Sequence, residues 1–353
     1  MAAVLKQSCL GNKNRARPES QTVSGHIILL YPLPFSGIMS KKTILSLALP
    51  YFHLNFKEPF QWSSGYEMPI YFDGKSFLSL PENRSAVLES IKKNTQSDAE
   101  FLPENFQTIA ATTMGGLVPG ASLAGELNKP FAFFYHRDLY RFTPGAVEKV
   151  ISGYAQYSKK NFDLVISTAP FGILPGVHLA DKLNLPFAYV RREKKMHGTQ
   201  NKIEGLHGLP AVESGQKPKA IFIDWYEGKS YGAKAVQEVE EYGVEVMEYK
   251  DLEIPLQGKG KLGRTLHLED VVSFGGGSLR DIHKERIYGA TIEHCLAVFT
   301  YGFAETLGRF SQEDCSLSSL LQFQEVLALS SWTGEEKEKL KVWHEKPKLK
   351  KWI

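Results

Sequence analysis

The chain has 353 residues, of which 42% are hydrophobic and 23% charged, and its formal net charge at pH 7 is only +3. A chain of this size buries a large core, and without a basic block in its body it is not expected to bind nucleic acid. No apolar run is long enough for a transmembrane helix, and three widely spaced cysteines argue against a disulfide framework or a zinc site, so no membrane partner and a reducing cytoplasm are expected.

The amino-terminal part divides into an extension and a more regular segment. Residues 1–38 are rich in Ser, Asn and Arg and then briefly apolar, without the order of a signal peptide. We expect them to be a disordered extension, because Met39 begins a stretch that resembles a natural start. Helices are predicted over Thr43–Phe56 and Leu80–Ile91, on either side of the Ser-Gly turn and aromatic strand of Phe60–Asp73.

An internal repeat follows. Asn105–Ala132 aligns without gaps on Asn161–Ala188, with 13 identical residues in 28 positions. Each copy has an apolar strand, a Gly/Pro loop, a helix and a Pro-Phe-Ala strand. Strands that alternate with helices predict a parallel sheet with right-handed crossovers.

Two later segments each contain a strand that ends in an acidic residue and is followed by a glycine-containing turn. Lys219–Gly232 has a single acid, Asp224, and its Gly-Lys-Ser ending is not a nucleoside-triphosphate loop because Ile223 replaces the first glycine. The interleaved order of these segments indicates either one enlarged sheet or two intertwined lobes.

The other segment, Arg264–Leu279, contains the most informative motif. Its strand ends in Glu269 and Asp270, and a loop of Ser273, three glycines and Ser278 leads into a helix. Glycines let backbone amides approach an anion, and a helix N-terminus adds positive charge. Such a site can hold a phosphate while the acids accept hydrogen bonds from sugar hydroxyls, which predicts a ribose 5-phosphate ligand.

These residues resemble the phosphoribosyl pyrophosphate (PRPP) motif of type I phosphoribosyltransferases. The resemblance implies that Glu269 and Asp270 hold the ribose 2- and 3-hydroxyls. It assigns the 5-phosphate to the loop residues Ser273, Phe274, Gly275, Gly276, Gly277 and Ser278. It also implies Mg²⁺ as cofactor, bridging the pyrophosphate and the ribose hydroxyls, with no direct metal ligand from the protein.

The stretch Tyr189–Gly205 resembles the mobile catalytic loop of orotate phosphoribosyltransferases. Its basic positions are matched by Arg191, Arg192, Lys195 and His197. Cations there stabilise the charge that develops on departing pyrophosphate, and a closing loop excludes water. The resemblance implies that Arg191 and Arg192 bind PRPP, and that Lys195, His197 and Asp270 are catalytic.

The resemblance also places the pyrophosphate loop and the partner subunit. The second copy of the repeat runs into the basic loop, so its residues Ala169, Pro170, Phe171 and Gly172 are assigned to pyrophosphate. The first copy is either structural or a second, degenerate site. Family members are homodimers whose mobile loop enters the neighbouring site, so Lys195 and His197 are expected to act in trans.

The expected fold is therefore α/β, a type I phosphoribosyltransferase-like parallel sheet flanked by helices. Residues 39–100 form an N-terminal hood and helix, 101–330 the core with its repeat, and 331–353 a C-terminal helix and basic tail. The carboxyl-terminal part is predicted to contain helices over Asp281–Tyr288, Ser316–Leu329 and Thr333–His344, with a strand over Ile292–Tyr301.

Three hypotheses concern the ligand. The first is transfer from PRPP to orotate. The second is transfer to another base, because Ser63 replaces a family lysine in the hood and Val298–Phe303 lacks the arginine that meets the base carboxylate. The third is a non-catalytic nucleotide-binding relative, motivated by Phe274 and the duplicated units.

Overall fold

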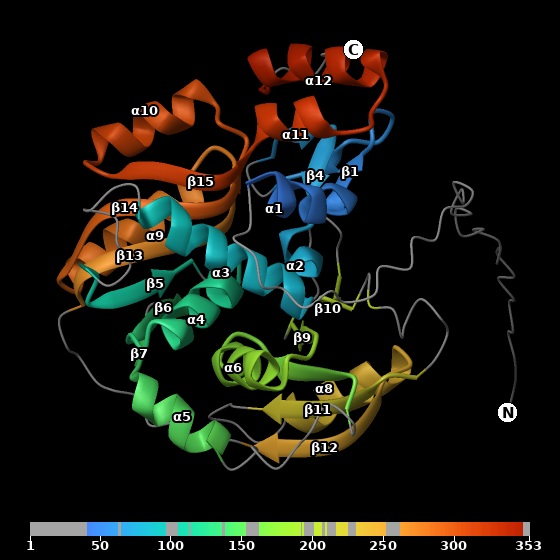
Figure 1. The fold of residues 1–353 in the computed structure, drawn as a ribbon, viewed down its shortest axis with the longest axis vertical. Helices are drawn as coiled ribbons and strands as arrows, with labels where there is room; N and C mark the ends of the chain where they lie inside the picture. Colours follow the sequence, from blue (N-terminus) through green and yellow to red (C-terminus); the bar gives the residue numbers. More distant parts are fainter. Residues whose placement is uncertain are drawn as a thin grey trace, which may run out of the picture. The chain divides into compact units, whose positions relative to one another are not determined.

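The structure is a computed structural model of the chain. It describes residues 41–62, 65–96, 105–112, 114–135, 138–152, 162–191, 193, 201–206, 209, 217–224, 231–251 and 262–348. Residues Met39–Ile353 form one compact unit, and Figure 1 shows its helices and strands. The extension predicted over 1–38 lies outside the described residues.

One sheet has six strands. They are β5 (Thr108–Ala111), β6 (Phe131–Tyr135), β7 (Asp138–Phe142), β13 (Gly263–Val272), β14 (Ala290–Thr300) and β15 (Ser316–Gln322). Their order is β15-β14-β13-β5-β6-β7, and all neighbours are parallel except β6 and β7. The carboxyl ends of β13 and β5 therefore meet at the same edge of the sheet.

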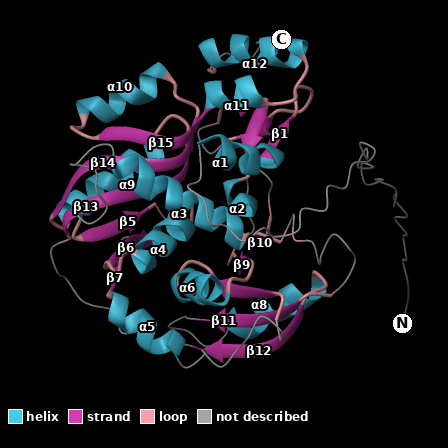
Figure 2. Cartoon of the chain, viewed as in Figure 1, coloured by secondary structure: helices cyan, strands magenta, loops and turns pink. Residues whose placement is uncertain are grey.

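A second sheet has five strands. They are β8 (Leu164–Thr168), β9 (Phe187–Val190), β10 (Ile203–Glu204), β11 (Lys219–Asp224) and β12 (Glu245–Asp251). Their order is β10-β9-β8-β11-β12, with only β9 and β10 antiparallel. The two copies of the repeat thus belong to different sheets (Figure 2), and the strands of the second sheet come from one continuous segment between β7 and β13 of the first.

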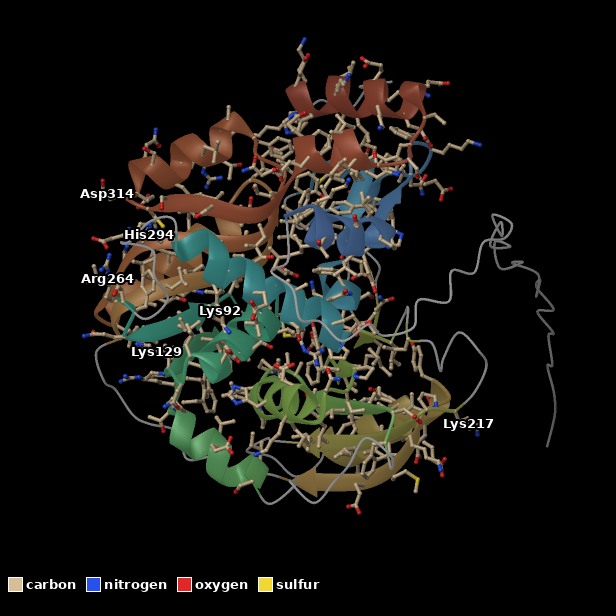
Figure 3. The ribbon with its side chains drawn as sticks, in the orientation of Figure 1. Lys92, Lys129, Lys217, Arg264, His294 and Asp314 are labelled. Atoms are coloured by element: carbon tan, nitrogen blue, oxygen red, sulfur yellow. The ribbon has the colours of Figure 1, made fainter. Side chains whose placement is uncertain are left out.

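Two helices of the repeat pack against each other between the sheets. α4 (Leu117–Glu126) covers β5 and β13, and α6 (Ile173–Leu183) covers β8 and β9 (Figure 1). Both helices bury most of their residues, as expected for helices that are apolar on every side. α3 (Pro81–Gln96) packs on α4, where Lys92 forms an ion pair with Glu126 (Figure 3).

The hood consists of short elements that precede α3. They are α1 (Lys41–Ala48), β1 (Phe52–Leu54), β2 (Phe60–Gln61), β3 (Glu67–Met68), β4 (Ile70–Phe72) and α2 (Gly74–Phe77). The helix predicted over Thr43–Phe56 is wrong beyond Ala48. A 3₁₀ turn, Leu49–Tyr51, follows because Pro50 has no N–H to continue the α-helix, and β1 then pairs with β4.

The remaining helices cover the sheets and the carboxyl-terminal end. They are α5 (Pro144–Ser152), α8 (Tyr231–Glu241), α9 (Gly276–Ile287), α10 (Ala304–Gln312), α11 (Phe323–Leu329) and α12 (Gly334–Glu345). The helix predicted over Ser316–Leu329 is wrong in its first half, because Ser316–Gln322 pairs with β14. The capping box at Thr333 and Glu336 is confirmed. Sheets flanked by helices confirm the predicted α/β fold.

Candidate active site

Two carboxylates lie near the carboxyl end of β13. Glu269 and Asp270 line a cavity of about 500 Å³, although only 3% and 5% of their surfaces are exposed. The loop after β13, the hood and the loop after β5 supply most of the remaining lining. The acid pair and the glycine loop, which were predicted to act together, therefore share one cavity.

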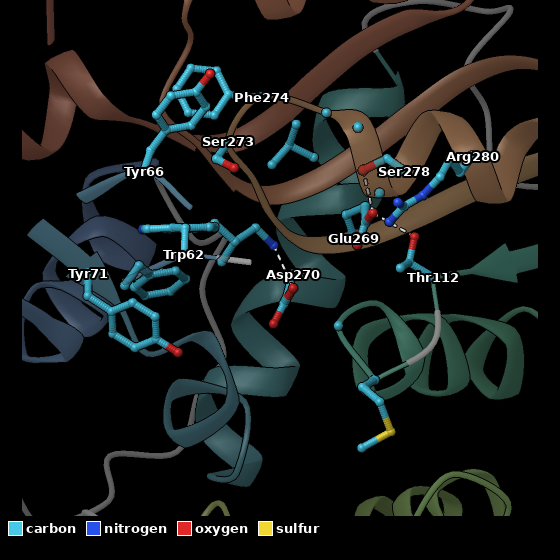
Figure 4. A pocket seen from close by; sticks show the side chains of 18 of the residues that line it. Trp62, Tyr66, Tyr71, Thr112, Glu269, Asp270, Ser273, Phe274, Ser278 and Arg280 are labelled. Atoms are coloured by element: carbon cyan, nitrogen blue, oxygen red, sulfur yellow. Dashed lines mark hydrogen bonds between the residues drawn. The ribbon is translucent and has the colours of Figure 1, made fainter. Parts of the chain in front are cut away.

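Glu269 is held by two hydroxyl groups. Its Oε1 atom accepts hydrogen bonds from Thr112 Oγ1 at 2.6 Å and from Ser278 Oγ at 2.5 Å, and Figure 4 shows both bonds. These donors fix the orientation of the carboxylate. Thr112 lies in the first copy of the repeat, so that copy contributes directly to the cavity.

A buried ion pair lies behind Glu269. His267 Nδ1 is 2.9 Å from Glu285 Oε2, and His267 Nε2 is 3.0 Å from Thr112 Oγ1. The threonine donates its only proton to Glu269, so Nε2 must donate to Thr112. Burial lowers the pKa of His267, but the carboxylates of Glu285 and Glu269 raise it more, to about 10. The hydrogen bonds and the pKa both favour an imidazolium.

Asp270 is paired with a lysine from the hood. Lys75 Nζ, on α2, lies 2.9 Å from Asp270 Oδ2, and the Val271 N–H donates to Oδ1 at 2.8 Å. Burial lowers the pKa of the Lys75 ammonium, but the Asp270 carboxylate raises it more, so the pKa lies well above its ordinary value. Lys75 is 195 residues from its partner, and no local pattern marks it as part of the site.

The loop between β13 and α9 has the geometry of an anion site. Gly275 precedes α9 with φ at +73°, a conformation that side chains other than glycine rarely adopt. The amides of the first turn of a helix have no partner within the helix, and they carry positive charge. A phosphate can accept these N–H groups without a dedicated side chain.

Helix α10 holds this loop from its outer side. Thr306 Oγ1 donates to the Ser273 carbonyl at 2.7 Å, and Arg309 Nη1 donates to the Phe274 carbonyl at 2.8 Å. A Cβ atom added to Gly275 would lie 2.6 Å from the ring of Phe310. The loop is therefore fixed at both its carbonyls and its glycine.

Phe274, which departs from the family motif, packs into an aromatic cluster. Its ring stacks on Phe303 at 4.9 Å and lies 5.0 Å from Tyr66 in the hood, and Figure 4 shows Tyr66 and Phe274 side by side. Trp62 and Tyr71 continue the hood side of the cavity. Burial raises the pKa of Tyr71 to about 12, so its phenol is neutral at physiological pH.

The cavity carries more positive than negative charge among its described lining residues. The cations are Lys75, Arg191, Arg280, Arg309 and Lys348, and the anions are Glu269, Asp270 and Glu305. Such a balance favours an anionic ligand. Apart from Arg191 and the acid pair, these charged residues were missed in the sequence because none belongs to a recognisable motif.

The pyrophosphate loop was predicted at Ala169–Gly172. These residues follow β8 in the second sheet and do not line the cavity. The equivalent loop of the first copy lines it instead, because β5 pairs with β13 whereas β8 pairs with β11. At Gly115 of that loop, an added Cβ atom would lie 2.6 Å from Asp270 Oδ1, so only glycine permits this close approach.

Of the predicted basic loop, Arg191 is placed at the cavity. It follows β9, and its Nε atom is 2.8 Å from Glu204 Oε1, a carboxylate that is 1% exposed. Burial lowers the pKa of Arg191, but the nearby Tyr189 and Glu204 raise it by more. The pKa therefore lies above its ordinary value, and the guanidinium stays protonated. Arg192, Lys195 and His197 lie outside the described residues, as does Ser63.

Comparison with known proteins shows related sequences. Orotate phosphoribosyltransferase from Streptococcus agalactiae serotype Ia is 23% identical over 282 residues, covering 80% of this chain and 81% of the relative. The Bacillus subtilis enzyme of that name is 24% identical over 300 residues, covering 84% and 87%. The chain is related to the type I phosphoribosyltransferases. No protein-family profile matches it.

The chain was also compared with solved structures, and its similarity to them is low. The crystal structure of orotate phosphoribosyltransferase from Aeropyrum pernix has a TM-score of 0.42 and 13% identity, covering 82% of this chain and 99% of that chain.

Among the described residues, no helix is both long and apolar enough to cross a membrane.

Proposed function

We propose that the cavity binds PRPP and transfers its phosphoribosyl group to a nitrogenous base, with release of pyrophosphate. Orotate is the first candidate base, giving orotidine 5-phosphate for pyrimidine nucleotide synthesis. The observation that carries the proposal is the meeting of two buried carboxylates and a glycine loop at one cavity. Carboxylates suit vicinal hydroxyls and the loop suits a phosphate ester, and PRPP presents both groups on one sugar.

The roles of individual groups follow from their positions. Glu269 and Asp270 accept the ribose hydroxyls, while the amides that open α9 hold the 5-phosphate. The loop of the first copy, at Met114 and Gly115, and the cations Lys75 and Arg191 then face the pyrophosphate. This orientation places the sugar between groups that were anchored before it binds, which lowers the cost of reaching the transition state.

During transfer, the bond from C1 of the ribose to the pyrophosphate oxygen breaks, a bond from C1 to the base nitrogen forms, and the proton of that nitrogen is released to solvent. Negative charge accumulates on the leaving group, and Lys75 and Arg191 stabilise it. The aromatic side chains Trp62, Tyr66 and Tyr71 keep water from the sugar, which would otherwise be hydrolysed.

The acid pair also fits the proposed cofactor. Mg²⁺ prefers carboxylate and phosphate oxygens, and Glu269 and Asp270 supply the first kind. The described residues contain no cluster of three His, Cys, Asp or Glu side chains able to hold a metal ion. In contrast to the expectation that the protein supplies no direct metal ligand, these carboxylates would help to hold Mg²⁺ together with oxygens of the ligand, and the ion would neutralise charge on pyrophosphate.

The base is proposed to lie against the hood. The rings of Trp62 and Tyr71 offer surfaces for a planar base, and the neutral phenol of Tyr71 can donate a hydrogen bond to a ring carbonyl. Another base is the second candidate, because Val298–Phe303 lacks the arginine that family members place there and Ser63 replaces a family lysine.

A base panel tests the proposal. The protein is incubated with PRPP, Mg²⁺ and orotate, or with other pyrimidine or purine bases, and nucleotide and pyrophosphate are measured. We expect product with orotate, while product with a different base alone supports the second candidate. The matched variants are Asp270→Asn, which should lose activity, and Asp281→Asn on α9, which should keep it. If no base gives product and PRPP does not raise the melting temperature, the proposal is refuted.

A further inference from the structure

The two sheets repeat one arrangement of five strands. The order β14-β13-β5-β6-β7 matches β12-β11-β8-β9-β10, and in both cases only the last pair is antiparallel. The register agrees as well. Ala111 faces Leu268 and Phe133 in the first sheet, as Ser167 faces Ile223 and Tyr189 in the second.

A specific hydrogen bond is repeated at the end of these strands. Thr112 Oγ1 donates to Glu269 Oε1 at 2.6 Å, and Thr168 Oγ1 donates to Asp224 Oδ1 at 2.7 Å. The register places Asp224 at the position of Glu269. The difference lies one residue later in the sequence, where Asp270 is matched by Trp225. The first module, made of β5 to β7 with β13 and β14, therefore has both acids of the pair. The second module, β8 to β12, has one.

The helices that join the modules meet in a two-fold pattern. Ser122 Oγ on α4 donates to Asp181 Oδ2 on α6 at 2.7 Å. The repeat matches Ser122 with His178 and Gly125 with Asp181. The corresponding contact should therefore join His178 to Gly125, and an added Cβ atom at Gly125 would lie 2.8 Å from the His178 ring. Reciprocal contacts of this kind are typical of an isologous interface between two copies of one subunit.

The second module also reaches the cavity of the first. Tyr189, on β9, donates its hydroxyl to the Met114 carbonyl at 3.4 Å, and Arg191, two residues later, lines the cavity. Arg191 is positioned by Glu204 on β10, which belongs to the same module. A cation of the first module's cavity thus comes from the second module of the same chain.

We propose that the chain is a dimer fused into one polypeptide, in which the second module takes the place of a partner subunit. The α4–α6 contact is then the internal counterpart of a subunit interface. The chain has one complete PRPP site, and Arg191 serves that site in cis. This arrangement replaces the homodimer expected from the resemblance, because the position of the partner is already filled.

The first test is the mass of the full chain in solution, measured by light scattering over a wide range of concentrations. We expect one chain, 39.6 kDa, at all concentrations. A stable particle of two chains overturns the proposal. This measurement does not depend on catalysis, so its outcome is separate from the success of the proposed function.

The second test rests on the proposed function and uses mixed variants. Asp270→Asn removes an acid and keeps Arg191, whereas Arg191→Ala keeps both acids. Each should weaken PRPP binding about tenfold or more, because a hydrogen bond to a charged group is lost. Arg264→Ala, at the opposite end of β13, is the control and should bind normally. If neither site variant weakens binding, the site assignment and with it the in-cis role of Arg191 are wrong.

Mixing the two variants distinguishes the arrangements. If Arg191 acted in trans, a mixed pair would combine intact acids with an intact arginine and would recover binding and activity. In the fused dimer, each chain keeps its own defect, so the mixture should show no recovery. Recovery of tight binding or turnover to about a quarter of the wild-type level, the share of restored sites in random pairs, overturns the proposal.

Discussion

The ion pair between Lys75 and Asp270 gives the sharpest test of the site. Replacing Lys75 by Met keeps most of the length of the unbranched side chain and removes its charge. Two opposite charges 2.9 Å apart attract by about 6 kcal/mol at an effective dielectric constant of about 20. Desolvation of both ions offsets most of this energy, so the intact pair contributes little net stability.

Removing only one partner has a larger effect. Among the described residues, Asp270 is then left buried with the Val271 N–H as its remaining hydrogen-bond donor, and we expect Lys75→Met to lower the free energy of unfolding by about 3 kcal/mol. Water can reach Asp270 through the cavity, which is why the expected loss is at the low end of the range for buried pairs.

A double-mutant cycle isolates the pair. Asp270→Asn removes the unpaired charge, so the variant with both changes should be more stable than Lys75→Met alone. Urea unfolding of the four proteins gives the coupling free energy, expected at about 1 to 3 kcal/mol. A coupling below about 0.5 kcal/mol would show that the two charges do not interact in the folded protein, and the account of Lys75 would be wrong.

Three further predictions concern neighbouring groups. The raised pKa of His267 means that its protonated form stabilises the fold fully below the ordinary pKa and that this stability is lost as pH rises toward 10. His267→Gln should therefore differ most from wild type in urea unfolding at about pH 6 and least near pH 10. Gly115→Ala should abolish PRPP binding in calorimetry, whereas Gly308→Ala, whose Cβ meets nothing within 4 Å, should bind normally and be up to about 1 kcal/mol more stable. Lys195→Ala should slow turnover more than it weakens PRPP binding in steady-state and binding assays, because its charge is proposed to act on the leaving group; equal effects would contradict that role.

The sequence revealed the groups of the site that lie in one continuous segment. Glu269, Asp270 and the glycine loop are adjacent, so their spacing alone indicates a strand, a turn and a helix that act together. Thr112 and Lys75 lie 157 and 195 residues from their partners. Their roles depend on which strands become neighbours, which no local pattern encodes.

The choice between the two repeat copies shows the same limit. Both have the residues for a strand, a tight loop and a helix, so local physics does not separate them. Pairing of β5 rather than β8 with β13 decides which loop meets Asp270. Secondary structure was misjudged for similar reasons at Ser316–Gln322, where pairing with β14 overrides a segment that reads equally well as helix.

The contacts from α10 to the loop between β13 and α9, the proposed 5-phosphate site, have an energetic consequence. Thr306 and Arg309 hold the loop's carbonyls on the outer side, so its backbone has little freedom left to lose when an anion arrives. Association then forfeits little conformational entropy, and the strength of the amide–phosphate bonds appears almost fully in the affinity. Removing those two hydrogen bonds would leave every atom proposed to contact the phosphate unchanged and would still lower the affinity for it.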